Sequence, residues 1–216
     1  MAHTDREIEW QLAGEDLGVV QRWLGANPEI EGLRIAPLPP QRLHDTYLDT
    51  VDWRIFHGGF ALRIRARAGI HEATLKSLRS ARADVADRRE ITEVITERPD
   101  SLVRATGPVG SQVSALAGRE PLRVLFIAET LRSRFGAHSL ERAAAAEIAL
   151  DETRLCSCHG TPIGRLQRVE VELTGGTAQA LLPFVTALRS GCALERATEN
   201  KFAAGLRAAG LAPMSA

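Results

Sequence analysis

The chain has few cysteines, no long apolar run and no net charge. Three cysteines are too few, and odd in number, for a disulfide scaffold. No apolar stretch approaches the roughly 18 residues of a membrane-spanning helix, and the first residues are unlike a signal peptide. Basic and acidic residues balance at 27 each, which argues against a generally basic nucleic-acid binder. We therefore expect a cytoplasmic protein with neither a nucleic-acid nor a membrane partner.

One short cluster, Cys156-Ser157-Cys158-His159, raises the question of a zinc site. It supplies at most three soft ligands, whereas a structural zinc site takes four, and nothing nearby completes the set. We interpret the cluster as a reduced loop or the end of a strand.

Charged residues alternate with apolar ones at strand spacing. Arg63, Arg65 and Arg67 share one face of a predicted strand, while Leu62 and Ile64 take the other. A single strand of this kind normally turns its charges to water. Several such strands, each with charges of one sign, are better explained by a closed barrel whose charged faces line a cavity and whose apolar faces pack outward against helices. Carboxylates alternate in this way at Glu7 and Glu9, at Glu147 and Asp151, and at Glu170 and Glu172.

Hydrophobic periodicity predicts an α+β fold in one domain over residues 1–216, since no repeat or linker interrupts the chain. The prolines at 37, 39 and 40 predict a loop, and residues 78–87 predict a hairpin loop. Strands are predicted at 7–12, 42–49, 61–68, 72–80, 88–95, 122–135, 140–151, 154–159 and 165–174. Helices are predicted at 14–24, at 101–117 with a break near Gly107-Pro108, at 177–190 and at 200–210.

Nine sequence elements then occur in a family-like order. They are Glu7-x-Glu9, Tyr47-Leu48-Asp49-Thr50, Leu62-Arg63-Ile64-Arg65, Thr74-Leu75-Lys76, Arg88-x-Glu90, Arg132-x-Arg134, Asp151, Glu170-x-Glu172 and Lys201. This order resembles the CYTH superfamily, the triphosphate tunnel metalloenzymes, from residue 7 to about residue 206. The nearest resemblance is to the bacterial inorganic triphosphatase branch, whose members often carry a helical CHAD domain that we do not expect here.

The resemblance implies an eight-stranded antiparallel β-barrel that forms a tunnel, with helices packed outside. It implies a monomer or homodimer that hydrolyses inorganic triphosphate, or a related nucleoside or thiamine triphosphate, to phosphate and a diphosphate product. Oxygen ligands suit the implied Mg²⁺ or Mn²⁺, and guanidinium groups suit the phosphates.

The same resemblance assigns roles to residues. The expected triphosphate-binding residues are Arg63, Arg65, Lys76, Arg88, Arg132, Arg134 and Lys201, and the expected metal ligands are Glu7, Glu9, Asp151, Glu170 and Glu172. Glu90 and Glu147 are expected either to help the metal or to orient the arginines. Lys76, Tyr47 and Glu9 are the catalytic candidates. Tyr47 with Lys76 resembles a base dyad of the thiamine-triphosphatase branch, and a tyrosine packed in the core is the alternative.

One position departs from the family pattern E-x-E-x-K, because Gln11 stands where the family has lysine. An amide lacks the charge of an ammonium group, so the change either costs a few kcal/mol of transition-state stabilisation or shifts substrate preference. Two alternatives stay open. A class IV-type adenylate cyclase would use the same tunnel for ATP, although no adenine-recognition signature is visible. A non-catalytic polyphosphate- or nucleotide-binding module would explain Gln11.

Overall fold

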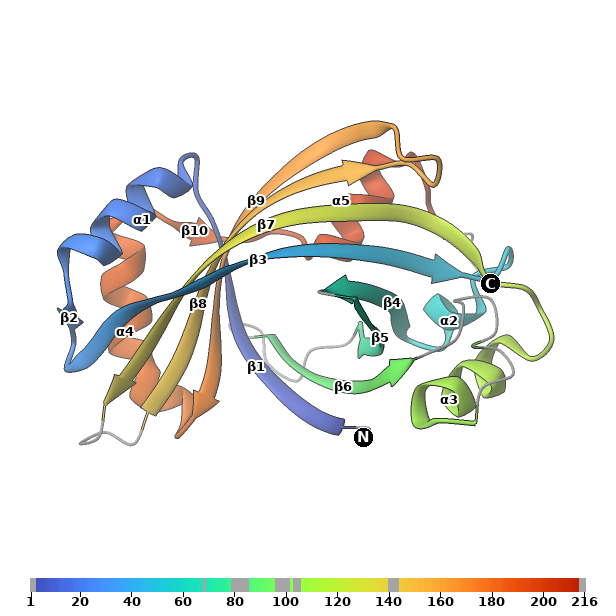
Figure 1. Cartoon of the computed structure of the whole chain (residues 1–216), viewed down its shortest axis with the longest axis horizontal. Coiled ribbons are helices and arrows are strands. Elements are labelled where there is room, and N and C mark those ends of the chain that lie inside the picture. The colour runs from blue at the N-terminus through green and yellow to red at the C-terminus, as the bar shows by residue number, and fades with distance from the viewer. Residues whose placement is uncertain are drawn as a thin grey trace.

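A computed structural model describes residues 3–67, 69–78, 86–95, 102, 106–139 and 144–213. Within these residues ten strands form one antiparallel sheet, in the order β10-β1-β6-β5-β4-β3-β7-β8-β9 with β2 paired to β3 (Figure 1). The strands are β1 (His3–Ala13), β2 (Glu29–Ile30), β3 (Leu33–Asp49), β4 (Phe60–Arg67), β5 (Ile70–Ser77), β6 (Ala86–Ile95), β7 (Arg123–Ser139), β8 (Ala144–Cys156), β9 (Pro162–Gly175) and β10 (Glu195–Arg196). The helices are α1 (Leu17–Ala26), α2 (Arg54–His57), α3 (Pro108–Ala117), α4 (Ala178–Gly191) and α5 (Lys201–Ala208). None of these helices is long and apolar enough to cross a membrane.

The strand β1 has three neighbours in the sheet. It pairs with β6 from His3 to Glu9, with β9 from Glu9 to Leu12, and with β10 at its end. The predicted antiparallel α+β fold is confirmed. The predicted eight-stranded closed barrel is not confirmed, because the described residues form a sheet of ten strands. The strands β2 and β10 have two residues each, too few for an alternating pattern to predict.

The loop predicted at the prolines of β3 is wrong, because β3 is one strand of 17 residues. Its pairing with β7 shifts register between Leu38 and Gln41, so Pro39 and Pro40 fall at an irregularity where fewer ladder N–H groups are needed. The strand β4 pairs with β3 only from His44 onward, which leaves the other edge of β3 unpaired at the prolines within the described pairings.

Other predicted boundaries also shift. The separate strand predicted at 154–159 is wrong, because β8 runs on to Cys156. The helix predicted from 101 is described from Pro108, a residue that favours the first turn of a helix. Most of the hairpin loop predicted at 78–87 lies outside the described residues.

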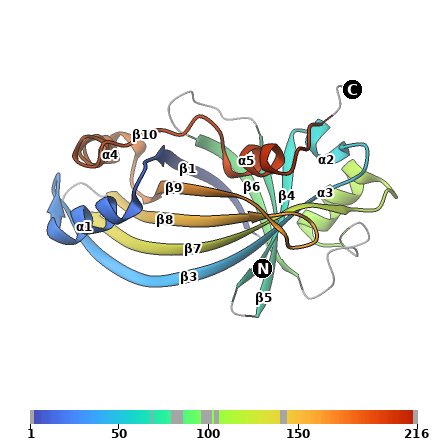
Figure 2. The same cartoon turned by 90° about the horizontal axis from the view of Figure 1, so that it is seen from above.

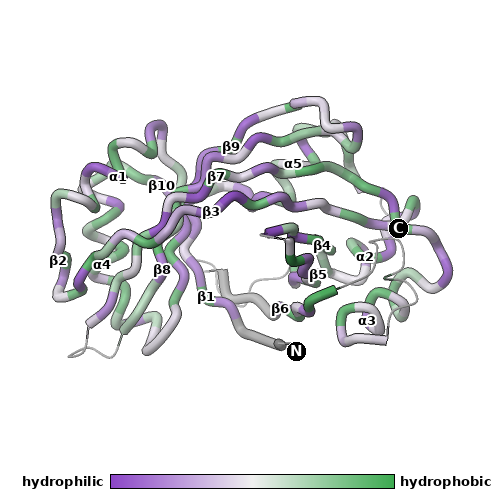
Figure 3. The backbone as a smooth tube through the Cα atoms, viewed as in Figure 1, coloured by the Kyte–Doolittle hydropathy of each residue, from purple (hydrophilic) through white to green (hydrophobic). Residues whose placement is uncertain are grey.

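Apolar side chains cover the outer face of the sheet at both ends of the molecule. At one end α1 and α4 pack on the strands, and Phe184 joins Ile148 in one buried cluster. At the other end α2 and α3 do the same, and Val113 joins Leu62 in a second cluster (Figure 1). Because side chains alternate along a strand, the charged residues beside Leu62 and Ile148 point to the inner face. Figure 3 accordingly shows hydrophilic colour where β3, β7 and β9 cross the middle of the molecule.

The helix α5 packs on the inner face instead. Phe202 and Leu206 join Phe126 of β7 in a third buried cluster, and Phe126 shares its face of the strand with Arg132, six residues further on. The close approach requires a glycine, because a Cβ at Gly205 would lie 2.1 Å from the Phe126 ring. The sequence therefore brings the start of α5 to the charged face of the sheet (Figure 2).

Candidate functional site

A cavity of about 220 Å³ opens on the charged inner face. The predicted site residues that line it are Glu7, Glu9, Tyr47, Arg63, Arg65, Lys76, Arg132, Glu170, Glu172 and Lys201, together with Glu90 and Gln11. Arg134 and Asp151 are not part of this lining. Arg88 pairs with Glu7 in register, and its side chain lies outside the described residues. Residues that are far apart in the sequence therefore line one cavity.

Lys76 is the basic centre on one side of the cavity. Its Nζ lies 2.9 Å from Oε1 of Glu90 and 3.4 Å from Oε1 of Glu9, and it hydrogen-bonds to Oε2 of Glu7. Burial opposes the charge on Lys76, but these carboxylates outweigh it and raise its pKa. Burial and the neighbouring negative charges raise the pKa of Glu7 to about 8, although Lys76 acts in the other direction. Lys76 therefore remains an ammonium group, which suits binding of an anion.

Two arginines of β4 line the same cavity with different partners. Nε and Nη2 of Arg65 donate to the two carboxylate oxygens of Asp45 at 2.7 and 2.8 Å. Burial favours the neutral form of Asp45, but Arg65 outweighs it and lowers the pKa of the carboxyl group. Arg63 donates only to the hydroxyl of Thr74, at 3.3 Å, and its buried Nε has no partner in the described part of the chain. Of the three arginines that line the cavity, Arg63 therefore has the most unused hydrogen-bond donors.

A second basic group is built around Asp151 of β8. Nε and Nη2 of Arg132 donate to its two oxygens at 2.7 and 2.8 Å, and Nζ of Lys201 donates to one of them at 2.9 Å. Nη2 of Arg132 also lies 2.6 Å from Oε2 of Glu170. Burial opposes ionisation of Asp151, but Lys201 and Arg132 outweigh it and lower the pKa of Asp151 to about 2. Asp151 therefore orients two cations toward the cavity, and its role as a metal ligand stays a prediction.

Arg134 lies further along β7. Its Nε donates to Oε1 of Glu147 at 2.7 Å, and its Nη2 donates to the other oxygen of that carboxylate. This geometry matches the expectation that Glu147 orients an arginine. The pair lies outside the lining of the cavity.

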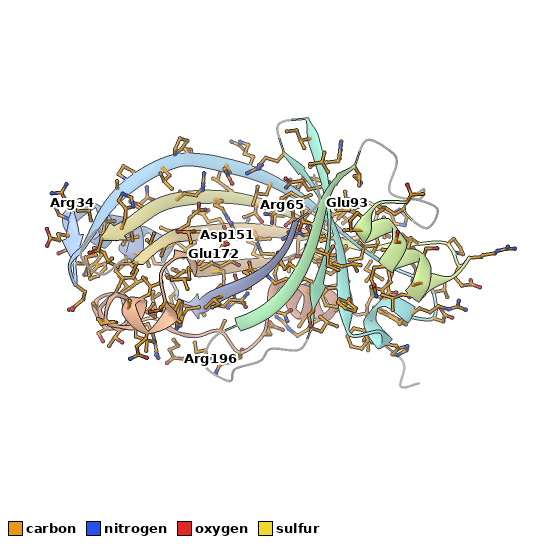
Figure 4. The ribbon with its side chains drawn as sticks, turned by 90° about the horizontal axis from the view of Figure 1, so that it is seen from below. Arg34, Arg65, Glu93, Asp151, Glu172 and Arg196 are labelled. Carbon is orange, nitrogen blue, oxygen red and sulfur yellow. The ribbon has the colours of Figure 1, made fainter. Side chains whose placement is uncertain are left out.

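Three carboxylates stand in one row across β1, β9 and β8. Glu172 is opposite Glu9 on one side and opposite Glu147 on the other. Burial, helped by the charges of these two neighbours, raises the pKa of Glu172. Like charges placed opposite each other repel, so this row favours a bound cation. Figure 4 shows Glu172 and Asp151 toward the middle of the molecule, with Arg34 and Arg196 at its periphery.

The oxygen donors of this row are the kind that bind hard divalent cations. No group of three or more carboxylate, imidazole or thiol side chains among the described residues is placed to hold a metal by itself. Mg²⁺ commonly uses one or two carboxylates and completes its shell with waters and substrate phosphates. The pair Glu9 and Glu172 therefore fits Mg²⁺ or Mn²⁺ in the presence of a phosphate ligand. The cluster Cys156 to His159 supplies no such group, and both of its cysteines are free.

Tyr47 is packed against aromatic rings. Its ring stacks on Phe126 with centroids 4.5 Å apart and lies 5.7 Å from Phe202. Burial, followed by the charge of Asp45, raises the pKa of its hydroxyl. Among the described contacts no hydrogen bond joins Tyr47 to Lys76. The geometry thus favours the packed tyrosine over the base dyad.

Gln11 faces the cavity from β1. Its Nε2 donates to Oε1 of Glu9 at 2.7 Å, and the residue stands opposite Glu170 in register. The amide therefore holds a carboxylate in place but adds no positive charge.

Sequence reasoning missed several residues at this site. Asp45 shares the face of Tyr47 two residues away, and this spacing is the signal that could have revealed it. Asn200 and Phe202 line the cavity beside Lys201. Asn200 caps α5, since its Oδ1 accepts from the N–H of Ala203 at 2.9 Å, and an asparagine immediately before a helical run is a recognisable start signal.

The fold and the site define a protein with an antiparallel sheet around a cavity of paired arginines, lysines and carboxylates. Residues 23–205 match the CYTH domain, so the chain belongs to the CYTH family. No curated protein matches the chain in sequence.

Solved structures share the fold at low sequence identity. A protein from Bacillus halodurans, proposed to be an adenylate cyclase, is 20% identical over 93% of this chain and 97% of that chain, with a TM-score of 0.60. A protein from Hippeastrum described as having a dominant triphosphatase activity is 19% identical over 95% and 97%, with a TM-score of 0.67. A protein from Pyrococcus horikoshii is 16% identical over 90% and 96%, with a TM-score of 0.52.

Proposed function

We propose that this protein is a metal-dependent triphosphatase that hydrolyses inorganic triphosphate, or a related triphosphate, to phosphate and a diphosphate product. The observation that carries the proposal is the cavity in which five cationic side chains meet the carboxylates of Glu7, Glu9, Glu90, Glu170 and Glu172. These cations are Arg63, Arg65, Lys76, Arg132 and Lys201. A linear polyanion would satisfy them, because guanidinium and ammonium groups bind phosphate oxygens strongly.

The substrate would lie in a tunnel walled by the eight long strands. The pairing of β1 supports a tunnel of this kind, because β1 pairs with β6 through its first half and with β9 through its second half. The helix α5 would close one end of this tunnel, since Asn200, Lys201 and Phe202 line the cavity there. The enclosed position limits water around the phosphates, which strengthens the electrostatic contacts.

Glu9 and Glu172 would hold the divalent cation, with Glu7 and Glu170 beside them. When bound, Mg²⁺ or Mn²⁺ would neutralise phosphate charge and polarise the phosphorus centre. Arg63, whose guanidinium has unused donors, would bind phosphate oxygens directly. Arg65 and Arg132 are already oriented by Asp45 and Asp151 and would need little rearrangement.

A second candidate function is a cyclase reaction on ATP. The similar structure from Bacillus halodurans, itself proposed to be an adenylate cyclase, favours it. In that reaction the same residues would hold the triphosphate of ATP. A non-catalytic polyphosphate- or nucleotide-binding module is the third possibility and is supported by the neutral Gln11.

Incubation of the protein with inorganic triphosphate, ATP or thiamine triphosphate distinguishes these functions. Phosphate, pyrophosphate and cyclic AMP are measured separately with Mg²⁺ and with Mn²⁺. We expect phosphate and pyrophosphate from inorganic triphosphate. Cyclic AMP with pyrophosphate from ATP would identify the cyclase instead, and binding without any product would identify the binding module.

A further inference from the structure

Arg168 of β9 is a buried basic residue with no role so far. It stands opposite Asp151 in register, and only 4% of its surface is exposed. Its Nη2 donates to the main-chain oxygen of Glu199 at 3.0 Å. No ion pair with a carboxylate is formed by Arg168 within the described part of the chain. Burial lowers the pKa of Arg168 even though Glu170, Glu199 and Asp151 act in the other direction.

The carbonyl that Arg168 holds belongs to the residue just before α5. Asn200 follows it and caps the helix, and Lys201 and Phe202 follow in turn at the cavity wall. The side chain of Glu199 is held from the other direction, because Nη2 of Arg207, in the last turn of α5, lies 2.6 Å from its Oε1. Glu199, the residue before the N-cap of α5, is thus held by one arginine from the sheet and by one from the helix itself.

We propose that Arg168 is a positioning residue, which holds the start of α5 so that Lys201 and Phe202 form the wall of the cavity. A buried guanidinium with a single carbonyl acceptor is costly, and a lysine that binds both Asp151 and a ligand needs a helix set to within a fraction of an ångström. The inference about α5 stands on geometry, and its consequence for triphosphate rests on the proposed function.

The test compares Arg168→Gln and Arg168→Lys with the exposed control Arg165→Gln on the same strand. Hydrogen exchange of the α5 amides is measured without ligand, and the Kd of inorganic triphosphate with Mg²⁺ is measured by calorimetry. We expect Arg168→Gln to speed exchange in α5, but not in α4, by about tenfold and to weaken binding by about tenfold. Arg168→Lys should give intermediate values because its ammonium group still donates to a carbonyl, and the control should match the wild type.

A double-mutant cycle separates positioning from general stability. In a Lys201→Ala background, Arg168→Gln should weaken binding no further, because the lysine that it positions is gone. Unchanged exchange in α5, or fully additive losses of affinity, would overturn the proposal. If Arg168→Gln unfolds, Arg168→Lys decides the matter: intermediate values support the role and wild-type values in both measurements reject it. Absence of triphosphate binding in the wild type would reject the proposed function alone, since exchange still reports on Arg168.

Discussion

Arg63 lines the cavity with a guanidinium that has no carboxylate partner within the described residues. Its charge is therefore available to a ligand, whereas Arg65 already binds both oxygens of the buried Asp45. The two arginines share a strand face, but their substitution has different consequences. Removing Arg65 would leave Asp45 charged and unpaired, which typically costs about 3 to 5 kcal/mol of stability.

Arg63→Ala is accordingly the cleaner test of triphosphate binding. We expect the Kd of inorganic triphosphate to rise at least about 30-fold, since a charge-assisted hydrogen bond of roughly 2 kcal/mol is lost. The melting temperature should change little. Arg42→Ala, an exposed arginine on the outer face of β3, is the matched control and should bind like the wild type. Equal affinities of Arg63→Ala and the control would remove Arg63 from the binding site.

Gln11 offers a gain-of-function test. In Gln11→Lys the new ammonium group would face Glu9 and Glu170, both within the cavity. We expect turnover of inorganic triphosphate to rise by about tenfold, which corresponds to ~1.4 kcal/mol of transition-state stabilisation. Steady-state kinetics at saturating Mg²⁺ measure this. Flat or reduced turnover would mean that Lys76 already supplies the charge at this place.

Among the secondary-structure elements, the charged strands were well predicted from the sequence. Alternation of Arg63 and Arg65 with Leu62 and Ile64 specified both the strand and its inner face. The pattern could not predict β2 and β10, which have two residues each, or the passage of β3 through Pro39 and Pro40. Bulges and short edge pairings depend on the neighbouring strand, and a single sequence does not show that neighbour.

The same limit applies to the candidate site. The strand motifs pointed to most of the residues that line the cavity. They did not separate residues that face the cavity from those that orient them, such as Asp151, because both share one face of a strand. Asp45, the partner of Arg65, and Arg168, which donates to the carbonyl of Glu199, were missed because their roles arise from contacts between elements.

The packing of α5 on β7 gives a prediction for a whole element. In Gly205→Ala the added Cβ would meet the Phe126 ring at 2.1 Å, so the helix must move. We expect about 1 to 3 kcal/mol of lost unfolding free energy and weaker triphosphate binding, because Lys201 moves with the helix. Chemical denaturation and calorimetry measure both effects.

Gly25→Ala in α1 is the control for this change. A Cβ there meets nothing within 4 Å, so the variant should be as stable as the wild type or up to about 1 kcal/mol more stable. Wild-type stability and affinity in Gly205→Ala would show that α5 does not need its close approach to Phe126.

For the molecule as a whole, the cavity makes stability depend on pH. The pKa of Glu7 is about 8 in the folded protein and 4.5 ordinarily, so between these values the folded state holds a proton that the unfolded state has lost. The stabilisation from Glu7 is therefore complete below pH 4.5 and decreases as pH rises toward 8. We expect the unfolding free energy of the ligand-free protein to fall by about 2 kcal/mol from pH 6 to pH 8.

Denaturant unfolding at the two pH values checks this expectation. Glu7→Gln removes the titrating group and should abolish most of the difference. A wild type that is equally stable at both values, or more stable at pH 8, would contradict the environment described for Glu7. The opposite sign holds for Asp151, whose pKa is lowered to about 2, so its contribution is lost only as pH falls below its ordinary value.

The magnesium dependence of inorganic triphosphate hydrolysis, in the wild type and in Glu172→Gln, tests whether the reaction needs a divalent cation bound at the carboxylates of the cavity. Phosphate release is measured as Mg²⁺ is varied, with a chelator as the zero point. We expect no hydrolysis with the chelator and hydrolysis that saturates with Mg²⁺ in the wild type. In Glu172→Gln we expect a loss of at least about 100-fold at limiting Mg²⁺, because one carboxylate of the cation site is gone. Hydrolysis without a divalent cation would show that the reaction does not depend on a metal, and full activity of Glu172→Gln at limiting Mg²⁺ would show that Glu172 does not hold one.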